Sequence, residues 1–235
     1  MKYIIQIKRQ GNRTSECYWQ EFFFEGDNNP SVASVLRALN ARTPLVDCSG
    51  KESTPIFWEC GCMVRKCGAC AMRINGIPRL TCSTFLDALK VKKIILEPLS
   101  KFPVVKDLAV DRSAIFEKLK DIHLWLESDA FITDYAQERC YQSARCLLCG
   151  CCLEVCPNFS VSGKFAGAIA PVNTFRVLNE EQDNDHKAKI SALYKQFYFE
   201  RCGKSLSCQN ICPAGIPVEE LMVRSNAAAI WKKRS

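Results

Sequence analysis

The chain has 235 residues, enough for two modest domains, and 48% of them are hydrophobic and 24% charged. The net charge is +7, and no apolar run approaches the roughly 20 residues of a membrane helix, so we expect a soluble or peripheral protein. Sixteen cysteines are unusual, but disulfide scaffolds are typically short secreted chains, and the start, MKYIIQIKRQ, alternates like a strand and does not resemble a secretory leader. The CxxC-type spacings indicate bound metal in a reducing compartment.

The first hundred residues predict strands and one helix. Segments 2–8 and 17–25 are rich in aromatic and branched residues and flank a polar turn at Gly11, which favours a hairpin. Ser31 is a suitable N-cap for a helix over 32–41, in which apolar residues recur on one face.

A second hairpin is predicted around the Asn-Gly pair at 75–76, which joins segments 70–74 and 77–82. Pro78 lacks an amide proton and therefore favours the edge of the sheet for the second segment. Residues 92–99 predict the last strand of this domain. A sheet, one packed helix and a cysteine-bearing loop form the plan of a plant-type ferredoxin.

After Pro103 the strand-like pattern of apolar residues gives way to helical spacing, and we place a domain boundary near residue 105. Helical spacing of Ile115, Leu119, Ile122 and Leu126 predicts an amphipathic helix over 112–128. The rest of the chain is expected to be helices interrupted by cysteine runs, with the acidic stretch 180–185 in an exposed loop or helix start. His123 lies in the helix predicted over 112–128 and His186 directly follows the acidic stretch; both are expected to be structural or solvated and not catalytic.

The first cysteine set has the spacing C-x4-C-x2-C, followed after eleven intervening residues by a fourth cysteine, the plant-type [2Fe–2S] pattern. Four thiolates also suit zinc, but the four-residue gap and the strand pattern favour the cluster. Three thiolates on a tight loop would wrap a small cluster, and the fourth would arrive from the predicted hairpin at 75–76. The expected ligands are Cys62, Cys67, Cys70 and Cys82.

Two later runs follow C-x2-C-x2-C-x3-C-P, except that the second run carries Ser205 at its second cysteine position. In bacterial two-cluster ferredoxins the fourth cysteine of each run ligates the other cluster. Applied here, this crossing gives a [4Fe–4S] site of Cys146, Cys149, Cys152 and Cys212, and a second site of Cys156, Cys202 and Cys208.

Three thiolates suit a cuboidal cluster that lacks one iron, so we predict [3Fe–4S] at the second site; a [4Fe–4S] cluster with a serine oxygen ligand is the alternative. Three clusters in one small chain predict a one-electron relay. No nucleotide-binding or nucleophile motif is present, and we expect no catalytic residue on this chain. A zinc-rich nucleic-acid-binding module would need a clustered basic, aromatic face, which the sequence lacks, so we expect no nucleic-acid partner.

The order of clusters, together with the stretches CGACAMRINGIPRLTC, CLLCGCCLEVCPN and SCQNICPAGIPV, resembles the iron–sulfur subunit of succinate dehydrogenase and fumarate reductase over essentially the whole chain. The resemblance implies an α+β protein: residues 1–105 form a β-grasp [2Fe–2S] domain, and 106–235 a helical two-cluster domain. The family's ligand positions map onto the eleven cysteines named above.

The resemblance also implies partners. Electrons would pass singly between the FAD of a flavoprotein subunit, which acts on succinate or fumarate, and a membrane anchor with quinone. The CPN and KFAGA segments are similar to the branch with a dihaem cytochrome b anchor, whose haem b commonly works with menaquinone. The subunit would be peripheral, on the cytoplasmic face of the cell membrane. A related flavoprotein complex that acts on another enoate is the alternative.

Overall fold

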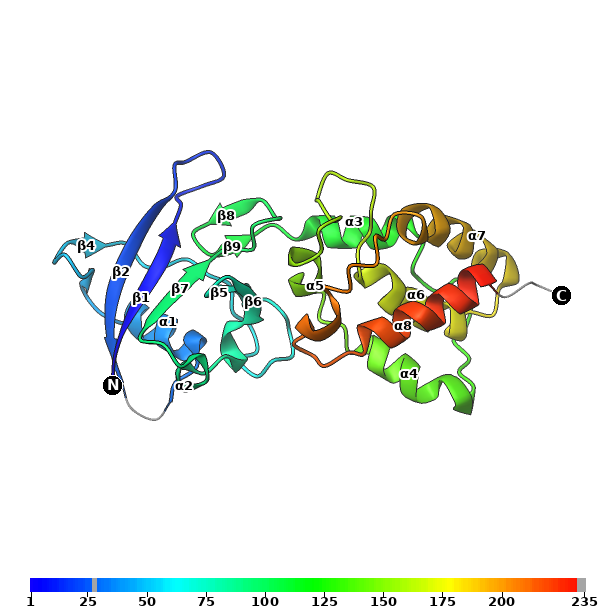
Figure 1. The fold of residues 1–235 in the computed structure, drawn as a ribbon, viewed down its shortest axis with the longest axis horizontal. Coiled ribbons are helices and arrows are strands. Elements are labelled where there is room, and N and C mark those ends of the chain that lie inside the picture. Colours follow the sequence, from blue (N-terminus) through cyan, green and yellow to red (C-terminus); the bar gives the residue numbers. More distant parts are fainter. Residues whose placement is uncertain (27–28, 232–235) are drawn as a thin grey trace. The chain divides into compact units, whose positions relative to one another are not determined.

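The computed structural model describes residues 1–26 and 29–231 (Figure 1). The chain divides into two compact units, Met1–Asp111 and Arg112–Ser235. The predicted boundary at residue 105 falls inside strand β8 (Val104–Lys106), which pairs with β9 (Ala109–Val110). Because these two strands hydrogen-bond to each other, the hairpin stays with the first unit and the chain leaves that unit only after it.

The first unit is built on a five-stranded sheet with the strand order β2-β1-β7-β5-β6. Strand β1 is antiparallel to β2 and parallel to β7, and β5 is antiparallel to both β7 and β6. The parallel pair at the centre is possible because a long connection, including the helix, separates β1 from β7. The strands are β1 (Lys2–Arg9), β2 (Tyr18–Glu25), β5 (Ala71–Ile74), β6 (Ile77–Leu80) and β7 (Lys93–Glu97).

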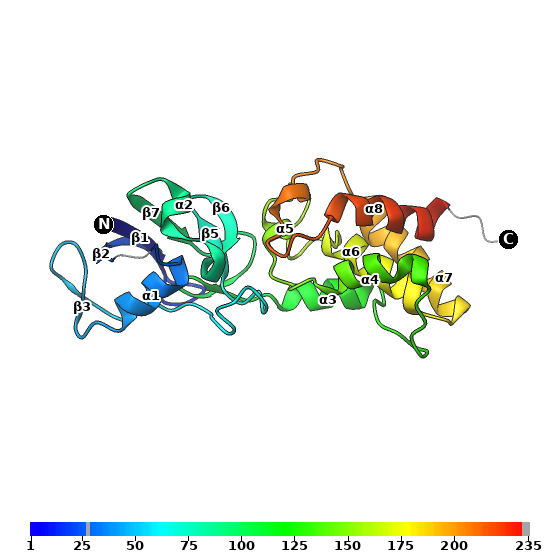
Figure 2. The same cartoon turned by 90° about the horizontal axis from the view of Figure 1, so that it is seen from below.

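Helix α1 (Val32–Asn40) covers one face of this sheet (Figure 2). It begins where predicted, because the Ser31 hydroxyl accepts a hydrogen bond from the Ser34 amide at 3.2 Å and so satisfies one free N–H of the first turn. Leu36 and Leu39 on its buried face share one core with the inward side chains of β1 and β7. The predicted helix and its contact face are therefore confirmed.

The second hairpin is also confirmed. Asn75 and Gly76 have φ of 50° and 79°, as a two-residue turn of this type requires. The Asn75 side chain accepts a hydrogen bond from the Ile95 amide at 2.7 Å, which ties the turn to β7. Pro78 lies in β6, the edge strand, as predicted.

Several short elements in the first unit have no counterpart in the predictions. The strand predicted over 92–99 is present as β7, but it is not the last strand of the unit, because β8 and β9 follow it. Strands of two or three residues are too short to show the alternation of apolar and polar residues by which a strand is recognised. The other additions are β3 (Leu45–Val46), β4 (Glu52–Ser53), a 3-10 turn (Thr81–Ser83) and α2 (Leu86–Leu89).

A buried ion pair closes the far end of β1. Arg9 is 1% exposed, and its Nε donates to Asp107 Oδ1 at 3.0 Å. The rest of its guanidinium donates to Gln20 Oε1 at 2.9 Å and to the Pro55 carbonyl at 3.3 Å. Asp107 in turn accepts from the Phe57 amide at 2.9 Å. One arginine thus joins the sheet to the loop at 54–57 and to the β8–β9 hairpin.

The second unit is helical. Helix α6 contacts α3, α4, α7 and α8, and therefore forms its centre. No helix among residues 1–26 and 29–231 is long and apolar enough to cross a membrane. The helices are α3 (Ser113–Asp121), α4 (Asp134–Ala144), α5 (Cys151–Glu154), α6 (Ile169–Glu180), α7 (Asn184–Tyr194) and α8 (Val218–Asn226), with a 3-10 turn at Gln209–Ile211 and π-helical turns at Lys195–Phe199 and Ala227–Trp231.

The predicted helix over 112–128 is too long. Helix α3 ends at Asp121, and His123 has φ of 57°, which turns the chain out of the helix. Its ring lies beside that of Trp125, at 4.4 Å between centroids, and beside that of His186, at 6.4 Å. The apolar periodicity continued past the end of the helix because the following loop also buries Ile122 against the unit.

The acidic stretch does start a helix, with Asp183 as the N-cap of α7, but it is not an exposed loop throughout. Glu181 is fully buried and accepts hydrogen bonds from the amides of Glu127 at 2.6 Å and Asp183 at 2.9 Å, and from the Ser128 hydroxyl. Burial raises the pKa of Glu181, but these hydrogen bonds outweigh it and lower the pKa to about 2. The carboxylate is therefore a structural acceptor.

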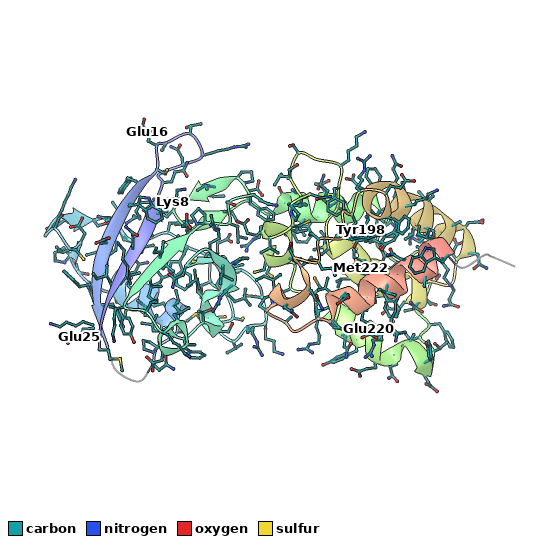
Figure 3. All side chains as sticks on the ribbon, viewed as in Figure 1. Lys8, Glu16, Glu25, Tyr198, Glu220 and Met222 are labelled. Atoms are coloured by element: carbon teal, nitrogen blue, oxygen red, sulfur yellow. The ribbon has the colours of Figure 1, made fainter. Side chains whose placement is uncertain are left out.

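The Arg9 ion pair generates a prediction about stability. Replacing Arg9→Met keeps the bulk of the side chain but leaves the Asp107 carboxylate buried without its cation, which costs about 3–5 kcal/mol. Denaturant unfolding of the chain, followed by circular dichroism, measures this loss. Lys8→Met is the matched control, since Lys8 lies on the other face of the same strand (Figure 3). Equal stability of the two variants would contradict the assigned role of Arg9.

Candidate iron–sulfur sites

Three of the first four predicted ligands lie on one tight loop before β5, and the fourth lies in the 3-10 turn directly after β6. The loop is wound by Met63, Arg65 and Gly68, whose φ values are 57°, 58° and 74°. The amide of Thr81 donates to the carbonyl of Cys70 at 3.2 Å, so the end of β6 is tied to the end of the loop. The hairpin thus returns Cys82 to the loop, as its sequence position predicts.

Backbone amides of this loop point at sulfur. The Sγ of Cys62 accepts hydrogen bonds from the amides of Val64 at 3.4 Å and Lys66 at 3.1 Å. These bonds lower the pKa of Cys62 to about 7, whereas burial, together with a hydrogen bond to Cys70, raises the pKa of Cys82 to about 11. The exposed side of the site therefore stabilises sulfur charge before any metal is bound, which suits a thiolate ligand.

The two later runs meet in the core of the second unit. Cys146 and Cys152 from the first run pack with Cys208 and Cys212 from the second run against the core that α4, α6 and α8 share. Burial raises the pKa of Cys146 to about 11, and the nearby thiols of Cys149 and Cys212 contribute to the rise. Cys212 therefore lies close to the first three cysteines of the first run, although these precede it by more than fifty residues in the chain.

The fifth cysteine of the first run, Cys151, is fully buried at the start of α5. It hydrogen-bonds to Cys149, and this bond is the main cause of a Cys149 pKa lowered to about 7. The spacing C-x2-C-x2-C-x3-C of the first run does not include Cys151, and the structure buries this thiol beside the predicted ligand Cys149.

A separate cavity brings together the remaining three cysteines, Cys156, Cys202 and Cys208, and Ser205 is part of its lining. Burial raises the pKa of Cys208, and Cys156 and Cys202 are close enough to raise it further. The side chains of Tyr198 and Met222, on the π-helical turn and on α8, also line the cavity (Figure 3).

The two runs are joined beside this cavity. Asn158 follows the Cys-Pro of the first run, and its Nδ2 donates to the Arg201 carbonyl at 2.9 Å. A Cβ at Gly203 would lie 3.0 Å from the Asn158 amide nitrogen, so a side chain there would displace this contact. The pairing of Asn158 with the backbone before Cys202 therefore favours the small residue at 203.

The donor sets fit iron–sulfur clusters. Among residues 1–26 and 29–231, no three His, Cys, Asp or Glu side chains converge as they would around a single metal ion. A cluster does not need such convergence, because its thiolates bind different irons. One set has four thiols at a loop with sulfur-directed amides, and the third has three thiols with a serine beside them. The second set has Cys146, Cys152 and Cys212 against the helical core, with Cys149 near Cys146.

Sequence reasoning missed one residue at the third site. Tyr198 lines this cavity beside Cys202 and is 2% exposed, and burial raises its pKa. The available signal was its position four residues before Cys202, the spacing that places two side chains on one face of a helix. The predicted pattern of helices interrupted by cysteine runs gave no reason to extend a helical turn up to this cysteine.

The chain matches two family models: a "2Fe-2S iron-sulfur cluster binding domain" over residues 4–117 and a "4Fe-4S dicluster domain" over residues 142–216. The succinate dehydrogenase iron-sulfur subunit of Bacillus subtilis is 35% identical over 90% of this chain and 86% of its own length. The fumarate reductase iron-sulfur subunit of Escherichia coli O6:H1 is 27% identical over 80% of this chain and 82% of its own length.

A chain in the solved structure "Mycobacterium smegmatis Sdh1 complex in the apo form" has the same fold, with a TM-score of 0.73 and 21% identity, over 100% of this chain and 99% of that chain. The fold agrees along the whole length, and the identity to the Bacillus relative extends over nine-tenths of it. The chain therefore belongs to the family of iron–sulfur subunits of succinate dehydrogenase and fumarate reductase.

Proposed function

We propose that eleven cysteines of this electron-transfer subunit hold three clusters. The observation that carries the proposal is the exchange of fourth cysteines: Cys212 lies among the first-run thiols, while Cys156 shares a cavity with second-run thiols. The proposed ligands are Cys62, Cys67, Cys70 and Cys82 for [2Fe–2S]; Cys146, Cys149, Cys152 and Cys212 for [4Fe–4S]; and Cys156, Cys202 and Cys208 for [3Fe–4S].

The chain's own residues prepare these sites. When bound, the clusters supply reversible one-electron transfer without proton chemistry on this chain. Backbone amides stabilise sulfur charge at Cys62, whereas Cys152 and Cys208 of the other two sets are partly buried against the helical core. Hydrogen bonds to sulfur and solvent exposure are two of the levers that set a cluster's reduction potential. The sites therefore differ in the features that separate potentials along a relay.

The domain assignment follows from these sites. We propose that the first unit, predicted as 1–105, is a plant-type ferredoxin-like β-grasp domain for [2Fe–2S], and that the second, predicted as 106–235, is the helical two-cluster domain. The mixed sheet with one packed helix supports the first assignment. The core shared by α4, α6, α8 and four cysteines supports the second.

Membership of this family implies a flavoprotein partner and a membrane-anchor partner. We propose that electrons pass between FAD of the flavoprotein, which exchanges hydride with succinate or fumarate, and haem b of a cytochrome b anchor that serves menaquinone. The subunit would be peripheral on the cytoplasmic face of the membrane. Gly203, constrained by Asn158, supports a route through haem, because position 203 itself carries no side chain that could contact a quinone.

The function is tested on the native membrane complex. Addition of succinate is expected to reduce the clusters, followed by electron paramagnetic resonance, and haem b, followed by absorbance. Fumarate is then expected to reoxidise clusters that were reduced with dithionite. Clusters that respond to dithionite but to neither carboxylate would contradict the substrate and indicate a relay for another enoate.

The third cluster is tested at Ser205. Ser205→Cys supplies a fourth thiolate at the cavity, so the variant is expected to bind one more iron per chain and to lose the paramagnetic signal of the oxidised three-iron cluster. Ser205→Ala is the control and should leave iron content and signal unchanged. If serine were a ligand, the unaltered protein would already hold the additional iron, and Ser205→Ala would release it.

A further inference from the structure

Tyr198 lies at the end of a continuous helical segment that leads directly into the third cysteine set. Helix α7 passes into the π-helical turn Lys195–Phe199, and the amide of Cys202 donates to the Tyr198 carbonyl at 2.9 Å. The backbone thus fixes the two residues one turn apart. Single π-helical turns frequently occur at functional sites, because the additional residue shifts a side chain out of its ordinary helical position.

The ring of Tyr198 is held on both sides. It stacks on Phe165, with centroids 5.7 Å apart and planes 19° apart, and contacts the ring of Tyr194 at 5.0 Å. With 2% of its surface exposed, the ring has little freedom to turn away from the cavity. The position of its hydroxyl is therefore set by packing and not by solvent.

The two neighbouring tyrosines use their hydroxyls differently. The Tyr194 hydroxyl donates to Asn226 Oδ1 on α8 at 2.7 Å, an ordinary structural bond between two helices. The Tyr198 side chain instead lines the cavity of the third cysteine set together with Cys202, and its hydroxyl is a hydrogen-bond donor close to that sulfur. One aromatic stack thus contains a hydroxyl directed at protein oxygen and another beside a predicted cluster ligand.

A hydrogen bond donated to a ligand sulfur changes the balance between two redox states. Reduction adds one electron to the cluster and increases the negative charge on its sulfurs, so a donor stabilises the reduced state more than the oxidised state. We propose that Tyr198 is a positioning residue that raises the reduction potential of the cluster held by Cys156, Cys202 and Cys208. This inference rests on the ligand assignment proposed above.

The experiment compares Tyr198→Phe with unaltered protein in the assembled complex, by redox titration of the oxidised three-iron signal. Removing the donor is expected to lower the equilibrium ratio of reduced to oxidised cluster about tenfold at a given potential, a downward shift of about 59 mV for one electron. The [2Fe–2S] and [4Fe–4S] potentials should stay in place. Unchanged titration of the three-iron signal would overturn the proposal.

Tyr194→Phe is the matched control, since it removes a hydroxyl from the same stack without touching sulfur. Its three-iron potential should equal that of the unaltered protein, and a comparable shift would overturn the proposal by assigning the effect to packing.

A second measurement does not depend on any variant. Electron–nuclear double resonance of the unaltered complex in H₂O and D₂O should show a coupled, exchangeable proton at the oxidised cluster, and its absence would overturn the proposal. The unaltered protein also tests the assignment separately: without a three-iron signal the proposed cluster fails, whereas a three-iron signal with no shift in Tyr198→Phe refutes only the role of Tyr198.

Discussion

The second unit depends on one constraint: cysteines from two runs, whose corresponding positions are more than fifty residues apart in the chain, lie against the same core. Cys212 lies beside Cys146 of the first run and Cys156 beside Cys208 of the second, so each proposed site draws on both runs. The α6 helix lies between the runs in sequence and contacts four other helices, which lets it support both. The two proposed sites of this unit can therefore form only when the unit folds.

In the first unit, most of the proposed ligands come from one short segment of the chain. Three cysteines lie within nine residues, and left-handed residues such as Arg65 and Gly68 direct the intervening amides toward sulfur. Only the fourth proposed ligand comes from elsewhere, and the Asn-Gly turn at 75–76 returns it within one hairpin. Rigidity comes from the sheet behind the loop and from the Arg9–Asp107 pair, which joins distant segments of the same unit. The loop can thus remain partly exposed without losing its shape.

Side chains outside the cysteine runs also shape the third cysteine set. The Glu181 carboxylate accepts a hydrogen bond from the Asp183 amide at the start of α7. That helix continues into the π-helical turn that carries Tyr198, which lies beside Cys202. Asn158 and Gly203 fit together where the two runs adjoin. The environment of the third cysteine set therefore depends on side chains outside the two runs, among them Phe165, Tyr198 and Met222, and not on the cysteine spacing alone.

Sequence by itself determined the spacing patterns, the two main hairpins, the capped helix after Ser31 and the family. These features depend on neighbours within a few residues, where turn chemistry and periodicity act directly. The tertiary structure decided where α3 stops, that Glu181 and Cys151 are buried, and that Tyr198 lies beside Cys202. Those outcomes could not be read from the chain, because each depends on what a distant segment packs against it, and burial is a property of the assembled core.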